Sequence, residues 1–181
     1  MAADSDLTSK KTALVDSSSA IILYKSGLIG SLIDLYLTVI SESVYAELTH
    51  EGYAGAEAFK IYCHEKKICV RGDVCGINND ADYLTTLAGL GAGERDTIML
   101  YHKGIGEFIV VDDGRGARYC KKNGIPHINA LLVPRLLYNA GKIDGDDRNH
   151  LMDIIIEYGR YSPWVIDYAR TCDDKELRYF Q

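Results

Sequence analysis

Short apolar runs of strand character alternate with amphipathic helical patterns along most of the chain. Four runs rich in β-branched and aromatic side chains lie at residues 12–16, 37–41, 67–72 and 108–111. The last of them, FIVV, has no polar alternation, which is typical of a strand at the buried centre of a parallel sheet. Helical patterns lie between and after these runs, at residues 17–25, 28–37, 41–50, 55–66, 81–89, 94–103 and 115–123.

The order of these elements predicts an α/β fold. Strands separated by helices imply a parallel sheet with right-handed crossovers, and we expect four or five strands between two helical layers (three-layer α/β/α). Residues 1–128 would form this core. Residues 129–181 would add a helical extension packed on the same domain, because LLVPRLLYNAGKI and LMDIIIEYGRYSPWVIDYA are amphipathic. The final ELRYFQ resembles the remnant of a protease-cleavage tag and is set aside.

The composition is that of a globular chain with an acidic balance. Of the 181 residues 47% are hydrophobic and 25% charged, and the formal net charge is −6. No run approaches the ~18 apolar residues of a membrane span. The polar start MAADSDLTSKK lacks the apolar core of a signal peptide, so we expect a cytoplasmic protein. The charge argues against indiscriminate nucleic-acid binding, but it suits a nuclease that gathers carboxylates around divalent cations.

Cysteine usage agrees with a reducing compartment. The cysteines are odd in number, and none forms a C-x-x-C pair, so reduced structural thiols are expected. A zinc site remains an alternative, although its spacing fits no standard pattern. Its ligands would be Cys63, His64, Cys69 and Cys75.

Two of the predicted strands end in aspartate. Asp16 follows the apolar ALV, and Asp112 and Asp113 follow FIVV and precede a glycine-rich turn. The carboxyl ends of parallel strands meet at one edge of a sheet, which is where ligands bind in open α/β folds. Each aspartate could instead cap the helix that follows it. We expect Asp16 and Asp113 to lie at the same sheet edge.

Three further acidic residues fall on predicted helices. Glu47 borders the apolar face of its helix, and Glu94 opens a helix after the sequence GAG. Asp96 lies two positions later, about 200° around, so Glu94 and Asp96 cannot both face the sheet squarely. Taken singly, these residues could be surface groups or could complement a helix dipole. Converging carboxylates repel unless they share protons or bind a cation, and oxygen-only ligands favour Mg²⁺ or Mn²⁺.

Four sequence blocks resemble the acidic blocks of PIN domains in order and spacing, over about residues 12–128. They read DSSSA from Asp16, VYAEL from Val44, GAGERDTI from Gly91 and IVVDDGRGAR from Ile109. They are most similar to the branch grouped with VapC-type toxins. The resemblance implies a Mg²⁺- or Mn²⁺-dependent endoribonuclease for single-stranded RNA, commonly a homodimer.

Carried over position by position, the resemblance also implies the site residues. The catalytic and metal-binding acids would be Asp16, Glu47, Glu94 and Asp113, with Asp96 and Asp112 as adjacent candidate ligands. Asp96 stands where a second glutamate is common in that branch, and the chain continues well past the usual end of the family pattern. The groups that could contact substrate are Ser18, Gly114, Gly116, Arg115, Arg118, Lys121 and Lys122. The basic residues among them could equally be a solvated helix face.

Two classes of function follow. The first is a metal-dependent endoribonuclease, the toxin of a toxin–antitoxin pair with an antitoxin protein as partner. The alternative is a non-catalytic PIN-like module that binds RNA or protein, and the presence of an acid at all four positions favours the first. In the nuclease, bound metal would lower the pKa of water, so no histidine base is required. A third hypothesis, a phosphatase or nucleotide-binding protein, is not supported, because the chain has no Walker or G-x-G-x-x-G sequence.

Overall fold

The computed structural model describes residues 10–72, 87 and 89–181, and its centre is a five-stranded parallel sheet. The strands are β1 (Thr12–Val15), β2 (Leu37–Ser41), β3 (Ile68–Arg71), β4 (Phe108–Val110) and β5 (His127–Ile128), in the spatial order β3-β2-β1-β4-β5. β1 pairs with β2 on one side and with β4 on the other. The chain order therefore reverses between β1 and β4, the position at which open α/β sheets bind ligands.

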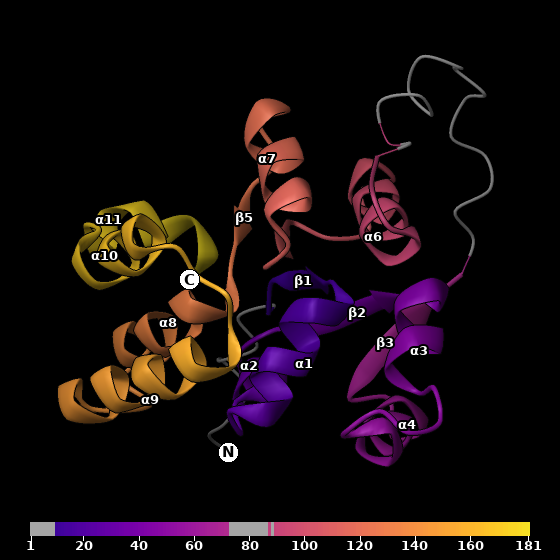
Figure 1. The fold of residues 1–181 in the computed structure, drawn as a ribbon, viewed down its shortest axis with the longest axis horizontal. Helices are drawn as coiled ribbons and strands as arrows, with labels where there is room; N and C mark the ends of the chain where they lie inside the picture. Colours follow the sequence, from indigo (N-terminus) through magenta and orange to yellow (C-terminus); the bar gives the residue numbers. More distant parts are fainter. Residues whose placement is uncertain (1–9, 73–86, 88) are drawn as a thin grey trace, which may run out of the picture.

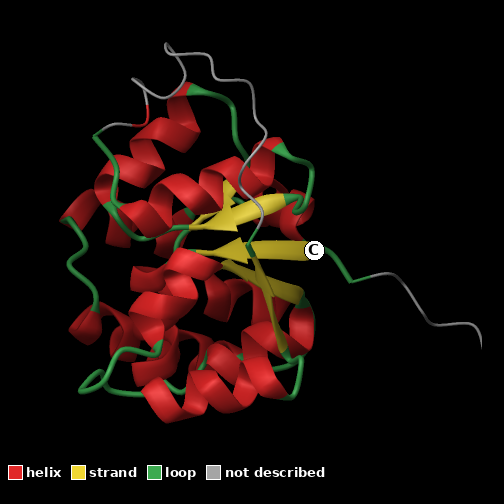
Figure 2. Cartoon of the chain, turned by 90° about the vertical axis from the view of Figure 1, so that its right-hand side faces the viewer, coloured by secondary structure: helices red, strands yellow, loops and turns green. Residues whose placement is uncertain are grey.

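Helices cover both faces of the sheet, so the predicted three-layer α/β/α fold is confirmed (Figure 2). Alternate strand residues point to opposite faces. Ala13 and Val15 join one apolar cluster, whereas Leu14 joins the other. The smaller cluster packs under α6 (Ala92–His102) and α7 (Gly114–Lys122). The larger one packs against α1 (Ser17–Lys25), α2 (Ile29–Leu35), α3 (Glu42–Leu48), α4 (Ala56–His64) and the helices after β5.

Residues after β5 form a series of helices beside α1 and α2, on the side of the molecule away from α3 and α4 (Figure 1). Their bounds are η1 (Ala130–Leu132), α8 (Val133–Asn139), α9 (Gly145–Tyr158), α10 (Pro163–Thr171), α11 (Asp174–Leu177) and η2 (Arg178–Phe180). Arg135, buried in α8, donates hydrogen bonds to the Ala169 carbonyl and to the Asp174 carboxylate. These bonds join α8 to the last helices of the chain.

The element pattern is close to the sequence prediction, with differences at the boundaries. β4 ends at Val110, so Val111 lies beyond the strand, and α2 ends at Leu35 instead of 37. Ser162 stands at the start of α10, but its side chain makes no capping hydrogen bond. The helix predicted at 81–89 lies mostly outside the described residues.

Setting aside the ELRYFQ tail was wrong. Leu177 and Phe180 are buried in the larger core cluster. The Phe180 ring packs edge-on against Phe108 of β4, with 5.1 Å between ring centroids. The Tyr36 hydroxyl donates a 2.6 Å hydrogen bond to the Phe180 carbonyl. The tail is part of the fold because its apolar side chains complete this core.

Candidate metal-binding site at the carboxyl edge of the sheet

Asp16 lies at the carboxyl end of β1, and only 2% of its surface is exposed. Its carboxylate caps α1 by accepting a 2.7 Å hydrogen bond from the Ser19 backbone N–H, and it accepts a second, of 2.8 Å, from the Ser18 hydroxyl. Burial, and next the nearby Asp112 carboxylate, raise the pKa of Asp16 to about 7. Asp16 therefore does cap the helix that follows it, as the alternative interpretation expected. The same side chain is a buried acid, and its burial makes ionisation costly.

Asp112 faces Asp16 from the end of the neighbouring strand. The ends of β1 and β4 lie side by side there, because Val15 pairs with Val110 and the Asp16 N–H donates a hydrogen bond to the Val110 carbonyl at 3.1 Å. The Asp112 carboxylate accepts hydrogen bonds from the Ala130 N–H, at 3.0 Å, and from the Tyr161 hydroxyl. Burial raises the pKa of Asp112 despite these bonds. Asp16 and Asp112 thus form one close pair of acids.

Glu94 and Asp113 form a second pair, between the start of α6 and the start of α7. Glu94 accepts a 2.8 Å bond from the Gly91 N–H, and Asp113 caps α7 by accepting one of 2.7 Å from the Arg115 N–H. Burial, and next the adjacent Asp113 carboxyl group, raise the pKa of Glu94. Burial alone would raise the pKa of Asp113, but the proximity of the Glu94 carboxyl group and the backbone N–H donors outweigh it and lower the value.

Glu47 and Asp96 make a third pair, where α3 packs against α6. Burial raises the pKa of Asp96, and Glu47 raises it further, against the opposing effect of Arg95. Asp96 accepts a hydrogen bond from the Ser43 hydroxyl, whereas Glu47 is exposed. Glu94 and Asp96 have different neighbours, as their separation around the helix predicts.

The three pairs do not form a ready-made metal site. Among residues 10–72, 87 and 89–181, no three acidic, histidine or cysteine side chains are grouped closely enough to hold an ion as they stand. The first two pairs are nevertheless neighbours, because Asp16 and Glu94 both act on Cys120 and raise the pKa of its thiol, after the larger effect of burial. These carboxylates lie where the chain order reverses between β1 and β4.

One buried oxygen suits a cation at this edge. Glu94 Oε1 is buried and accepts no hydrogen bond from any residue that the structure describes. A buried acceptor without a donor destabilises the fold. Two neighbouring carboxylates also repel each other unless they share a proton or bind a cation. The donor set is entirely oxygen, which fits Mg²⁺ or Mn²⁺. The carboxylate oxygens of Asp16, Glu94, Asp112 and Asp113 are therefore of the chemical kind that a hard divalent ion takes as ligands.

The residues predicted to contact substrate lie at the same edge but differ in their partners. Arg115 is 4.0 Å from Glu94 and 3.6 Å from Asp113, and its guanidinium donates to the Gly89 carbonyl at 3.2 Å. It therefore neutralises the acids directly. Ser18 bonds to Asp16. Arg118 and Lys121 are exposed on α7.

Sequence reasoning missed the contribution of the segment between α9 and α10. Tyr161 lies 49 residues after Asp112 in the chain, and its hydroxyl donates a hydrogen bond to that carboxylate. Beside this bond lies a pocket of about 310 Å³, lined by Ser18, Ile21, Ile22, Asp112, Asp113, Tyr158, Arg160 and Tyr161. The local sequence there is an amphipathic pattern interrupted by GRYSP. Such a pattern does not indicate that Tyr161 contacts Asp112.

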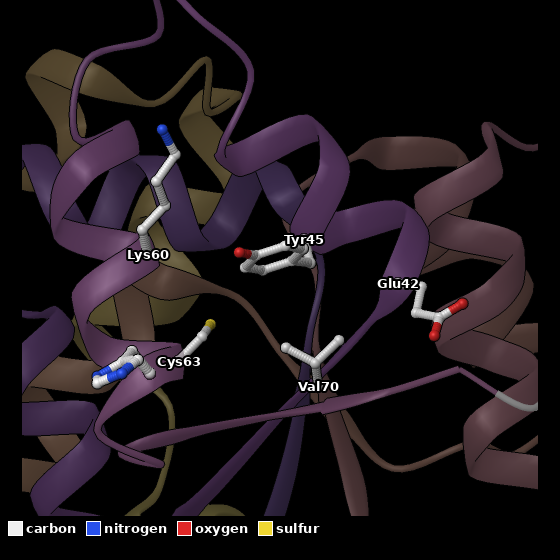
Figure 3. A pocket seen from close by; sticks show the side chains of 6 residues that line it. Glu42, Tyr45, Lys60, Cys63 and Val70 are labelled. Atoms are coloured by element: carbon white, nitrogen blue, oxygen red, sulfur yellow. The ribbon is translucent and has the colours of Figure 1, made fainter.

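A second hollow lies away from these acids, over β3, α3 and α4. Its volume is about 600 Å³, and its lining residues include Glu42, Tyr45, Lys60 and Cys63. Figure 3 shows the Lys60 amine and the Glu42 carboxylate at opposite ends, with Tyr45 between them. Burial raises the pKa of the Cys63 thiol to about 11, so the thiol stays protonated. Because its polar groups do not converge, this hollow lacks the features of a catalytic site.

The zinc alternative finds no support in the described part of the chain. Cys63 and Cys69 are free thiols, and neither belongs to a group of three potential metal ligands among the described residues. Cys75 lies outside those residues.

Comparison with known proteins gives one match. A family model described as a PIN domain matches residues 12–169. The chain belongs to the PIN-domain family. No curated protein and no solved structure matches it significantly. The match extends beyond residue 128 and includes α8, α9 and most of α10, so the segment that carries Tyr161 lies within the family region of this PIN domain.

Proposed function

We propose that this PIN domain is a Mg²⁺- or Mn²⁺-dependent endoribonuclease that cleaves single-stranded RNA. PIN domains are nuclease-type modules, and the family match supports that general class. The observation that carries the specific proposal is the crowding of Asp16, Asp112, Glu94 and Asp113 at the switch point of the sheet, with the pKa of Asp16 raised to about 7 by burial and Asp112. Acids arranged at such cost to the fold are typical of functional sites.

The roles of the individual residues follow from their contacts. When bound, a divalent ion would supply an activated water and neutralise charge on a phosphodiester. Asp16, Glu94 and Asp113 would hold it. Asp112 would join them or orient its neighbours, because its two oxygens already accept bonds from Ala130 and Tyr161. Arg115 lies close enough to both Glu94 and Asp113 to offset their charge before an ion arrives. Glu47 and Asp96 would act at the outer rim.

The proposal extends to partners and place of action. We infer a VapC-like toxin with an antitoxin protein, acting in the cytoplasm as a homodimer whose interface includes the C-terminal helices. The amphipathic character of those helices and the exposure of Trp164, 72% of whose surface is open to solvent, support such an interface. No single helix in the described part of the chain is long and apolar enough to cross a membrane. Only when α1 and α2 are taken together, with a bend of 114° between them, do they have the length and apolar composition of a membrane span.

Cleavage of labelled single-stranded RNA with Mn²⁺ tests the proposal. Wild-type protein should cleave, leaving 5′-phosphate and 3′-hydroxyl ends, and EDTA should stop the reaction. Asp16→Asn should abolish cleavage, because it removes a ligand charge while keeping the acceptor that caps α1. Asp144→Asn is the matched control. Asp144 also caps a helix, α9, through two 2.9 Å bonds, and lies about 20 Å from the Tyr158 end of that helix. Cleavage that survives EDTA, or 2′,3′-cyclic phosphate products, would contradict the mechanism.

The alternative is a PIN module that binds RNA or protein without catalysis. The absence of a ready-made group of three metal ligands among the described residues is the observation in its favour. Thermal unfolding separates the two. A metal site should raise the melting temperature with Mn²⁺ concentration, by mass action, and EDTA should remove the gain. A melting temperature unchanged by Mn²⁺ would favour the binding module.

A further inference from the structure

The pocket beside Asp112 combines an apolar floor with a polar outer wall. Ile21 and Ile22 of α1 form its apolar side. Asp112 and Asp113 form the side that it shares with the acidic residues described above. Its volume of about 310 Å³ lies at the small end of the range for ligand pockets. A pocket of this size suits one small planar group and excludes a large ligand.

The outer wall is formed by residues at the end of α9 and just after it. Tyr158 is the last residue of α9 and lines the pocket, and 48% of its surface is exposed. Arg160 follows two positions later, also exposed, and no acidic side chain in the described part of the chain forms an ion pair with it. An aromatic ring and a free guanidinium beside an apolar floor are the groups on which unpaired bases stack and phosphates bind.

We propose that this pocket holds one unpaired nucleobase of a single-stranded RNA, next to the phosphodiester at the acidic edge. Tyr158 stacks on the base, Ile21 and Ile22 form the surface beneath it, and Arg160 binds an adjacent backbone phosphate. The proposal rests on the proposed ribonuclease function and adds to it a subsite for one base of the single strand. A base in a duplex is stacked on both faces and paired along one edge, so it cannot enter a pocket of this size.

The test measures RNA binding without cleavage. A fluorescently labelled single-stranded RNA is titrated with wild-type protein in EDTA, and its affinity is compared with that of the same RNA carrying one abasic position, moved along the strand in successive oligonucleotides. Base stacking on aromatic side chains contributes about 1–3 kcal/mol, so one abasic position should weaken binding roughly 5- to 160-fold. The comparison between two RNAs of equal charge cancels the repulsion from the acidic edge.

Two variants assign the effect to the pocket. Tyr158→Ala should weaken binding of the intact RNA by a similar factor and should remove the penalty of the abasic position. Tyr53→Ala is the matched control, because 53% of its surface is exposed and it lines neither hollow described here. Arg160→Gln should reduce the salt dependence of binding, whereas Arg178→Gln, an exposed arginine in η2, should not.

The outcomes separate this proposal from the proposed function. If every abasic position is tolerated, or if Tyr158→Ala leaves the abasic penalty unchanged, the pocket does not hold a base, whatever the nuclease assay shows. Equal affinity for duplex RNA would overturn the proposal as well. If the abasic penalty depends on Tyr158 but Mn²⁺ supports no cleavage, the base pocket stands and the catalytic assignment fails.

Discussion

At the residue scale, two acidic side chains of this PIN domain have a structural role in addition to the chemical role that we propose. Asp16 and Asp113 both cap helices, and both lie at the carboxyl ends of adjacent parallel strands. The sequence allowed each role separately, because an aspartate before a helix and an aspartate after an apolar strand look the same. What it could not show is that Asp16 is almost fully buried and lies against Asp112. Those facts depend on the strand register, and they set the energetic cost of the site.

The first prediction at this scale concerns pH and the metal-free protein. Burial and Asp112 raise the pKa of Asp16 from its ordinary value of 3.8 to about 7 in the folded state. Its contribution to stability is therefore fully present below about pH 4 and is lost as the pH rises through 7. In EDTA, Asp16→Asn should gain stability over wild type between pH 5 and pH 8, by on the order of 2 kcal/mol, because the variant has no buried charge to form.

Urea unfolding at several pH values measures this difference. The matched control is again Asp144→Asn, since Asp144 also caps a helix but is exposed and does not belong to the acidic pairs. Saturating Mn²⁺ should reverse the order at pH 8, because wild type binds the ion more tightly than the variant. A constant gap between wild type and Asp16→Asn across this pH range would show that Asp16 is not a strained acid.

At the scale of elements, local pattern predicted most of the sheet and of the helices around it. Apolar runs bounded by turns indicated β1, β2, β3 and β4, and the helical patterns at residues 17–25 and 41–50 indicated α1 and α3. β5 was not assigned, because two residues after Pro126 carry too little pattern. The bond from Tyr161 to Asp112 also escaped prediction, since a contact across 49 residues has no local periodicity.

Two glycines at the start of α7 were interpreted alike from the sequence, as positions where the backbone approaches a phosphate. The structure separates them. A Cβ on Gly116 would lie 2.8 Å from Val111 Cγ2 and 3.2 Å from Glu94 Oε1, whereas one on Gly114 would have nothing within 4 Å. Gly116 therefore lets α7 pack closely over the Glu94 carboxylate. Sequence alone could not distinguish the two, because neither position shows what packs against it.

The prediction for this element is a contrast between two alanine substitutions. Gly116→Ala should lower the free energy of unfolding by about 1 kcal/mol, since crowding outweighs the gain in helix propensity. It should also weaken Mn²⁺ binding, because the new methyl group displaces Glu94. Gly114→Ala should change stability by no more than about 0.5 kcal/mol and leave Mn²⁺ binding intact. Denaturant unfolding and Mn²⁺ titration check both, and equal behaviour of the two variants would contradict the close packing.

At the scale of the whole molecule, the C-terminal helices share a core with the sheet. One apolar cluster includes Val15 of β1, Phe108 of β4, Leu136 of α8 and Phe180 at the end of the chain. This shared cluster is the contact on which the prediction that residues 129–181 pack on the same domain now rests. Those residues should unfold together with the sheet, because removing them would expose the Phe108 side of the core. The sequence showed amphipathic helices here, but not the surface that they cover.

Calorimetry of wild type and of Phe180→Ala tests this packing. Wild type should unfold in a single transition whose calorimetric and van't Hoff enthalpies agree. Phe180→Ala should move that whole transition to lower temperature by removing about 2–4 kcal/mol, because the ring contacts Phe108 and is largely buried. Ile61→Ala, in α4, is the control, since 54% of the Ile61 surface is exposed and little burial is lost. A separate early transition that alone responds to Phe180→Ala would mean that the C-terminal helices form a second unit. In that case Tyr158 and Tyr161 would be attached to the acidic edge only weakly, and the base pocket would open before the sheet unfolds.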